Sequence, residues 1–198
     1  MKKIIKKLAI ILMIALPPVT FLEANENILS IGSKNAKVTV RVFSSLTCPH
    51  CANFHDKIFE NLKKEYIDKK KIKFEHHSFP LDLAALNAEK VIRSIENKEK
   101  SFEFLKVIYE KQDQWAIGTD INKINNYIKK IGKEFGLNDE RMDKFINDEK
   151  IQDQILNERI NAQKNYNISS TPTIYINEKK YEGEHNFKAF KKVLDKII

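Results

Sequence analysis

Cysteine is scarce in this chain of 198 residues, which contains only Cys48 and Cys51. Any disulfide within the chain, and any metal site with cysteine ligands, must therefore use this one pair. Proline and glycine are also rare, with five residues of each, and the sequence contains no internal repeat and no low-complexity linker. The hydrophobic content of 42%, with twelve Phe, predicts one folded domain with a full core, or one domain that carries a large insertion.

Arginine is the second scarce residue, because only four of the 35 basic residues are Arg. The net charge is +8, but the lysines are spread along the chain and interleaved with acidic residues. The sequence has no Arg cluster and no alternation of aromatic and basic residues of the kind that binds nucleic acid. We therefore interpret the charge as a solvated surface and expect no nucleic-acid partner.

The one distinctive apolar run, from Leu8 to Leu16, lies near the N-terminus. It is shorter than the ~20 residues that span a bilayer. Four lysines precede it, and Pro17-Pro18 and then Ala24 follow it. This pattern predicts a secretory signal peptide over residues 1–24, with an uncleaved membrane anchor as the alternative. Export to the periplasm would place the two cysteines in an oxidising compartment.

A strand–helix–strand unit is predicted over residues 37–76. Residues 36–43 alternate Val with polar residues, and residues 71–80 form a second β-type segment. A helix to about residue 69 connects them, because large apolar residues recur at every fourth position: Phe54, Ile58, Leu62 and Tyr66. A helical crossover of this kind makes its two strands parallel.

The remaining chain is predicted to be helical over residues 81–166 and to return to strands over residues 171–183, with a turn at 177–180 and a second strand at 181–183. A final helix should begin after Asn186, with an inward face made by Phe190, Val193, Leu194 and Ile197. The sequence thus predicts an α/β fold, βαβ followed by ββα in one mixed sheet, with an inserted all-α domain. The expected divisions are residues 25–80, 81–166 and 167–198.

A metal site is a weak explanation of the cysteine pair. Structural zinc needs four ligands, so histidines would have to supply the second pair: His50, His55, His76 or His77. The last two are neighbours in a predicted strand and point to opposite faces. Haem attachment fails because Ala52 occupies the position that requires His. A static disulfide would close so small a loop that it would stabilise the fold little.

A redox pair has positive support. Cys48 follows a strand and opens a helix, where unpaired N–H groups and the helix dipole favour a thiolate. Pro49 suits the first helical turn, and a protonated His50 would favour the thiolate further. Cys51, one turn into the helix, is expected to be more buried and to act as the resolving thiol. No metal and no cofactor beyond an exchangeable Cys48–Cys51 disulfide is expected.

The sequence resembles the DsbA-like thiol–disulfide oxidoreductases of the thioredoxin superfamily. The resemblance rests on CPHC at 48–51, FPLD at 79–82, Thr171-Pro172 before a strand, and the helical insertion. It implies a thioredoxin fold, with a cis peptide at Thr171–Pro172 that packs beside Cys48 and binds an extended substrate. It also implies that the partners are reduced or unfolded exported proteins and a DsbB-like membrane oxidase.

Two departures from the family bear on the activity. Many members carry a buried acid six residues before the first cysteine, where this chain has Val42. Thr171 before the proline is more typical of the isomerases of this family. Those isomerases usually carry an N-terminal dimerisation domain, and the dozen or so residues between Ala24 and the first predicted strand leave no room for one. A monomeric oxidase is the leading hypothesis. The alternatives are an isomerase, a reductase or, in another class, a redox-inert chaperone.

Four further residues of chemical interest are expected to have structural roles or none. His55 should lie on the surface of the active-site helix, and His76 and His77 should be structural. Trp115 should pack inside the helical insertion.

Overall fold

The computed structural model describes residues 28–198, so the predicted signal peptide lies outside the described residues. A mixed sheet in the order β1-β3-β2-β4-β5 forms the centre of the molecule. Its strands are β1 (Leu29–Gly32), β2 (Val38–Ser44), β3 (Ile72–Ser78), β4 (Thr173–Ile176) and β5 (Lys179–Lys180). As predicted, β2 and β3 are parallel, and the other neighbouring pairs are antiparallel.

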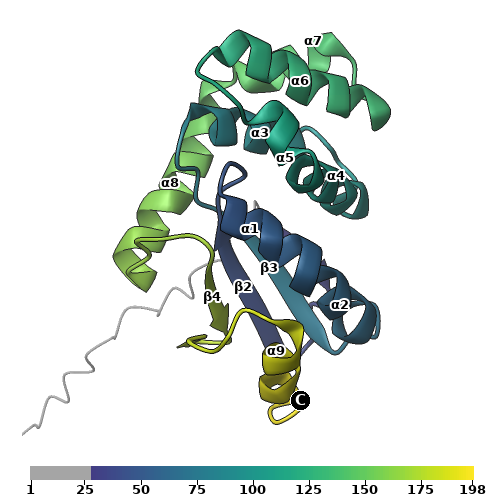
Figure 1. Ribbon diagram of the computed structural model, residues 1–198, viewed down its shortest axis with the longest axis vertical. Coiled ribbons are helices and arrows are strands. Elements are labelled where there is room, and N and C mark those ends of the chain that lie inside the picture. Colours follow the sequence, from purple (N-terminus) through teal and green to yellow (C-terminus); the bar gives the residue numbers. More distant parts are fainter. Residues whose placement is uncertain (1–27) are drawn as a thin grey trace, which may run out of the picture.

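One long helical segment connects β2 to β3 and covers one face of the sheet (Figure 1). It comprises α1 (Pro49–Phe54), α2 (Glu60–Leu62), and the π-helical turns η1 (His55–Phe59) and η2 (Lys63–Ile67). The predicted apolar stripe is confirmed, since Phe54, Ile58, Leu62 and Tyr66 are all buried. This stripe holds the start of α1 at the carboxyl end of β2.

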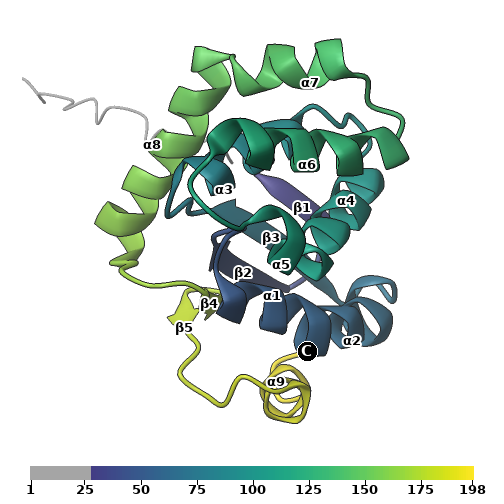
Figure 2. The same cartoon turned by 45° about the horizontal axis from the view of Figure 1, so that its top comes forward.

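Six helices follow β3 and confirm the helical insertion: α3 (Leu83–Arg93), α4 (Lys98–Glu110), α5 (Gln112–Trp115), α6 (Ile121–Glu134), α7 (Asp139–Ile146) and α8 (Glu149–Tyr166). Helices α3 to α7 lie above the end of the sheet where α1 begins, and α8 returns beside the sheet to β4 (Figures 1 and 2). Trp115 is buried among them. None of the described helices is long and apolar enough to cross a bilayer.

Aspartate and asparagine N-caps define where five of these helices begin. In each case a side-chain oxygen accepts a hydrogen bond from a backbone N–H of the first turn, which contributes about 1 kcal/mol per helix. The caps are Asp82, Asn97, Asp120, Asn138 and Asp148. Asn186 caps the last helix, α9 (Phe187–Leu194), as predicted.

Three predictions about the sheet and its flanks are wrong. Strand β1 was not predicted, and β5 lies at Lys179–Lys180 instead of 181–183. The second error arises because Asn177 adopts a left-handed φ of 54°, which closes the β4–β5 hairpin in a tight turn. On α9, Phe190 and Leu194 are buried, but Val193 is 36% exposed and Ile197, which lies beyond the helix, is 45% exposed.

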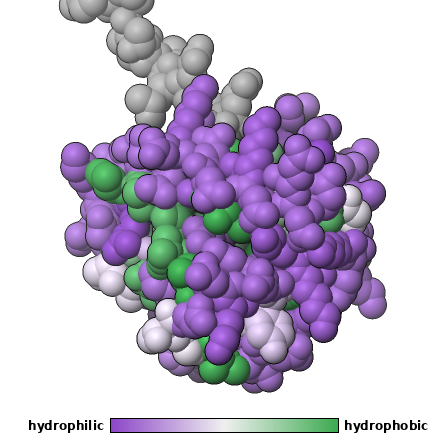
Figure 3. Space-filling view, turned by 90° about the horizontal axis from the view of Figure 1, so that it is seen from above, coloured by the Kyte–Doolittle hydropathy of each residue, from purple (hydrophilic) through white to green (hydrophobic). Residues whose placement is uncertain are grey.

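The surface seen from above in Figure 3 is mostly hydrophilic, with a narrow band of hydrophobic residues between the polar ones. Many of the lysines form ion pairs with acidic neighbours, such as Lys129 with Asp143 and Lys133 with Asp139. This distribution agrees with a solvated charged surface.

Candidate active site

The two cysteines lie at the junction between the sheet and the helical insertion. Cys48 is the N-cap of α1, and Pro49 occupies the first helical turn, as predicted. Both cysteines are free thiols. Cys48 keeps 7% of its surface exposed and Cys51 none, so only Cys48 can meet a partner from solution.

The two thiols differ sharply in acidity. A hydrogen bond from the Cys51 thiol, and further ones from the backbone N–H groups of Cys51 and His50, lower the pKa of Cys48 to about 5 against the opposing effect of burial. Burial and the neighbouring Cys48 raise the pKa of Cys51 far above its usual value. The His50 side chain is exposed. His50 lowers the pKa of Cys48 through the hydrogen bond from its backbone N–H.

Thr171 and Pro172 lie beside Cys48, although 123 residues separate Thr171 from it. The Cys48 Sγ donates to the carbonyl oxygen of Thr171 at 3.3 Å. The Thr171–Pro172 peptide is cis, as the resemblance implied. The structure therefore brings together both segments that the sequence singled out.

A third segment, which the sequence analysis missed, also reaches the pair. The side-chain amide of Gln112 donates to the carbonyl oxygens of Leu46 at 2.7 Å and Cys48 at 3.2 Å. The hydroxyl of Tyr109 donates to the carbonyl oxygen of Ser45 at 3.4 Å. No local pattern marks these two residues, because their roles depend on how α4 and α5 dock above α1.

His55 is buried, which contradicts the prediction of a surface position. Only 4% of its surface is exposed, and its ring stacks on Tyr109 with a centroid separation of 4.4 Å. Burial lowers its pKa well below the usual value, and nearby His76 lowers it further. The spacing Cys51, His55, Phe59 places all three on one helix face, and this signal could have revealed the burial.

His76 and His77 have separate surroundings on the two faces of β3. The Nε2 atom of His76 lies 2.7 Å from a carboxylate oxygen of Glu89, and both side chains are buried. His77 instead lies 3.0 Å from Glu75. Val42, which occupies the usual acid position, is fully buried and pairs with His76 across the sheet.

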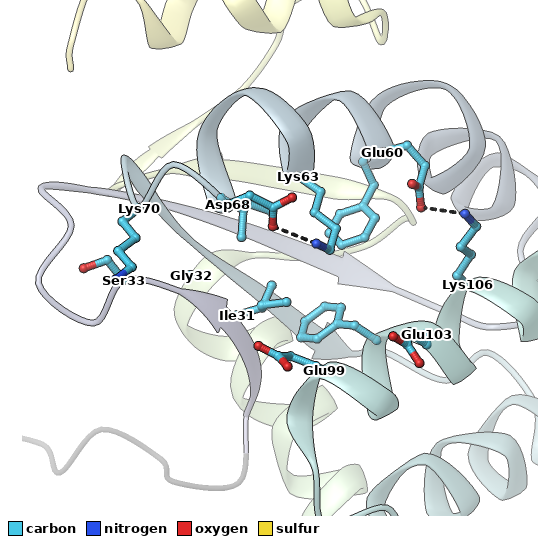
Figure 4. Close-up of a pocket in the computed structure, with 13 residues that line it drawn as sticks. Ile31, Gly32, Ser33, Glu60, Lys63, Asp68, Lys70, Glu99, Glu103 and Lys106 are labelled. Carbon is cyan, nitrogen blue, oxygen red and sulfur yellow. Dashed lines mark hydrogen bonds and ion pairs between the residues drawn. The ribbon is translucent and has the colours of Figure 1, made fainter. Parts of the chain in front are cut away.

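Within the described residues, no group of three or more Cys, His, Asp and Glu side chains is arranged to hold a metal ion. A cavity of about 750 Å³ lies between the end of β1, the η2 segment and α4, and contains neither cysteine. Figure 4 shows that ion pairs occupy its rim, Lys63 with Asp68 and Lys106 with Glu60. The cysteine pair is thus the chemically distinctive site.

Comparisons with known proteins agree with this site. The chain matches the family described as Thioredoxin over residues 24–196. A Rickettsia bellii protein, provisionally named a protein-disulfide oxidoreductase, is 29% identical over 180 residues, which cover 91% of this chain and 68% of that protein. Disulfide bond formation protein D of Bacillus subtilis is 29% identical over 178 residues, covering 85% and 76%.

Among solved structures, the crystal structure of Wolbachia pipientis alpha-DsbA1 matches with a TM-score of 0.82 and 29% identity, covering 89% of this chain and 93% of that one. The fold, the cysteine pair and the similarity to these proteins together define an enzyme of thiol–disulfide exchange. The chain belongs to the thioredoxin family, within which it is a DsbA-like thiol–disulfide oxidoreductase.

Proposed function

We propose that the protein is an exported dithiol oxidase that donates its Cys48–Cys51 disulfide to reduced proteins. The observation that carries this proposal is the position of Cys48 at the start of α1, where hydrogen bonds from Cys51 and His50 lower its pKa to about 5. A stabilised thiolate favours the reduced form, and a pair whose reduced form is stabilised is a stronger oxidant. The same contrast in acidity assigns nucleophilic exchange to Cys48 and resolution to Cys51.

The proposed exchange has two steps. A substrate thiolate attacks the Cys48 sulfur, the Cys48–Cys51 bond breaks, and Cys51 leaves with the electron pair. A second thiolate of the substrate then attacks the substrate sulfur that is bonded to Cys48, and Cys48 leaves as a thiolate. Two electrons thereby pass from the substrate to the cysteine pair.

An unfolded polypeptide suits the surroundings of Cys48. Leu81 and Leu83 are 49% and 53% exposed. They flank Asp82, which accepts a hydrogen bond from the Thr47 hydroxyl at 2.7 Å, so they lie close to the cysteine pair. Apolar side chains of an unfolded protein can contact them, while its main chain lies along Thr171 and Pro172.

The reduction potential of the Cys48–Cys51 pair tests the oxidase assignment. Equilibration with a glutathione buffer should give a potential well above the value of about −270 mV that is typical of thioredoxin. A potential near the thioredoxin value would contradict the oxidase proposal and favour a reductase.

The roles of the two cysteines are tested by a pair of variants. Cys48→Ser should abolish oxidation of a reduced model peptide, because no exposed sulfur remains. Cys51→Ser should retain a reactive Cys48 and accumulate a mixed disulfide with an activated disulfide such as oxidised glutathione. Oxidation of the peptide by Cys48→Ser at the wild-type rate would refute Cys48 as the nucleophile.

The location and the recycling partner are part of the same proposal. Residues 1–24 direct export, and a DsbB-like membrane oxidase restores the disulfide in the periplasm. Cell fractionation followed by N-terminal sequencing tests the first statement, with cleavage after Ala24 as the expected result. Loss of the oxidised form in cells that lack the membrane oxidase tests the second.

A further inference from the structure

The proposed oxidase reaction creates a demand for a proton at a buried atom. When a substrate thiolate attacks Cys48, Cys51 leaves as a thiolate. This thiolate has no exposed surface, and a thiol of high pKa is a poor leaving group. A proton delivered to the Cys51 sulfur as the bond breaks removes this difficulty.

Two polar side chains lie at the buried face of the active-site helix that carries Cys51. His55 follows Cys51 by one helical turn on the same face of the helix. Tyr109, from α4, stacks on the His55 ring at an interplanar angle of 24° and donates to the Ser45 carbonyl. The backbone N–H of the same residue, Ser45, donates a hydrogen bond to the Cys51 sulfur. Tyr109 and Cys51 therefore both form hydrogen bonds with the main chain of Ser45.

The His55 ring has hydrogen-bonding capacity that the described residues do not use. Both of its nitrogens are buried and have no hydrogen-bond partner among the described atoms, and the same holds for the Ser44 hydroxyl. Buried polar atoms are nearly always partnered, by protein or by ordered water. A neutral imidazole accepts at one nitrogen and donates from the other, which is the property that proton transfer requires.

The same two side chains also line a cavity that leads to the surface. The cavity measures about 410 Å³ and lies between the active-site helix and α4. His55 and Tyr109 line it and are buried. Its other charged lining residues are Asp56, Glu60, Lys106 and Glu110. Asp56 and Glu110 are exposed, so protons from solution can enter at this end.

We propose that His55 and Tyr109 form a proton path between this cavity and the sulfur of Cys51. The inference rests on the proposed oxidase function and adds the source of the proton. As the Cys48–Cys51 bond breaks, the Tyr109 hydroxyl gives its proton to the Cys51 sulfur and regains one from the His55 ring through water bound at the unpartnered His55 nitrogens, and the cavity returns a proton to His55. Both residues act through Cys51 and neither contacts the substrate.

The test measures single-turnover reduction of the oxidised full-length protein by a reduced model peptide, with acid quenching at short times. His55→Phe and Tyr109→Phe keep an aromatic ring and remove the proton-transferring group. Each should slow the reaction by about a hundredfold, the lower end of the range for lost acid–base assistance. The alkylation profile of Cys48 should not change, because neither residue donates to its sulfur.

A matched control and a rescue separate proton transfer from structure. His77→Phe makes the same replacement on the opposite face of β3 and should react at the wild-type rate. His55→Ala opens space next to the cavity, so added imidazole should restore its rate, whereas it should leave Tyr109→Phe slow. Added imidazole would not restore the rate of a variant that is slow only because it is misfolded.

The proposal is overturned if His55→Phe and Tyr109→Phe react as fast as the wild type, or if His77→Phe slows the reaction equally. It is also overturned if Glu89→Gln, on the far side of His76, is the variant that slows the reaction while the two path variants do not. A wild-type protein that fails to oxidise the peptide contradicts the proposed function instead, so the two failures are distinguishable.

Discussion

Gln112 holds the main chain of Cys48 from across the domain boundary: its side-chain amide lies 3.2 Å from the Cys48 carbonyl oxygen and 2.7 Å from that of Leu46. These carbonyls belong to the loop that ends β2 and starts α1. One side chain of the helical insertion therefore fixes the position of the cysteine pair.

Removal of this contact should weaken the fold and loosen the site. Gln112→Met keeps the length of the side chain and loses both donors, which should lower the free energy of unfolding by about 1–3 kcal/mol, since the Leu46 and Cys48 carbonyls each lose a hydrogen bond. Gln114→Met, at an exposed position of the same helix, is the control and should change little. Urea unfolding of both variants measures the difference, and equal losses would contradict the role of Gln112.

Alkylation of the reduced protein should show one reactive cysteine. Cys48 should react with iodoacetamide with a midpoint near pH 5, because its pKa is about 5, whereas an ordinary cysteine has a pKa of about 8.5. Cys51 should stay unmodified, because it is buried. In urea both should react with the ordinary midpoint. A midpoint near pH 8.5 in the folded protein would refute the stabilised thiolate.

The same pKa contrast predicts how the stability of the reduced form depends on pH. Since the pKa of Cys48 is lower in the folded than in the unfolded chain, the unfolded chain binds more protons between about pH 5 and pH 9. The reduced form should therefore gain stability as pH rises through this window and lose the gain as pH falls to 5. The oxidised form has no such thiolate. Urea titrations of both forms at pH 5 and pH 8 measure the difference.

Glu89 should be important for stability near neutral pH. Burial alone would raise its pKa, but His76 and Arg93 together hold that pKa below the usual value. Glu89→Gln removes the buried carboxylate that lies 2.7 Å from the His76 Nε2 atom and should cost about 3 kcal/mol at pH 7. The gap to the wild type should narrow as pH falls through the folded pKa of Glu89, where the wild type also becomes neutral.

A surface ion pair supplies the control for this prediction. Glu178→Gln removes an exposed partner of Arg41 and should change stability little, because exposed ion pairs contribute little. Chemical unfolding at pH 7 and pH 3 compares the two variants. A gap for Glu89→Gln that stays constant over this range would contradict the ionised pair.

Gly32 should tolerate no side chain. Its φ is 98°, and a Cβ there would collide with the carbonyl oxygen of Ile72. Gly118 has a φ of 78° and open space around it, so Gly118→Ala should cost only the left-handed backbone term of about 1–2 kcal/mol. Gly32→Ala should cost clearly more, as thermal unfolding would show. Equal losses would mean that the β1–β3 edge adjusts freely.

The parts of the fold that the sequence predicted are those with long periodic patterns. The stripe from Phe54 to Tyr66 and the helices between β3 and β4 each repeat over several turns, so the local pattern and the tertiary structure agree. Strand β1 has only four residues, and its burial is partial. It is a strand because β3 offers it an edge, and this cause lies outside its own sequence.

The candidate site divides in the same way. The cysteines and Thr171-Pro172 carry local signatures, and the prediction that they meet was correct. Gln112, Tyr109 and Glu89 carry none, because each reaches the site through the docking of a separate helix. His55 was misplaced because a polar residue on a helix was assigned to solvent, although its spacing from Cys51 puts it on the buried face.

Since residues 45–51, the α4–α5 region and Thr171 are far apart in the chain, their convergence depends on completed folding. In the unfolded polypeptide Cys48 has the acidity of an ordinary cysteine. Its special reactivity arises only when α1 has formed, because the hydrogen bonds that lower its pKa come from Cys51 and His50. Folding is thus the activation step of this enzyme, and an unfolded chain carries two thiols no more reactive than those of a reduced substrate.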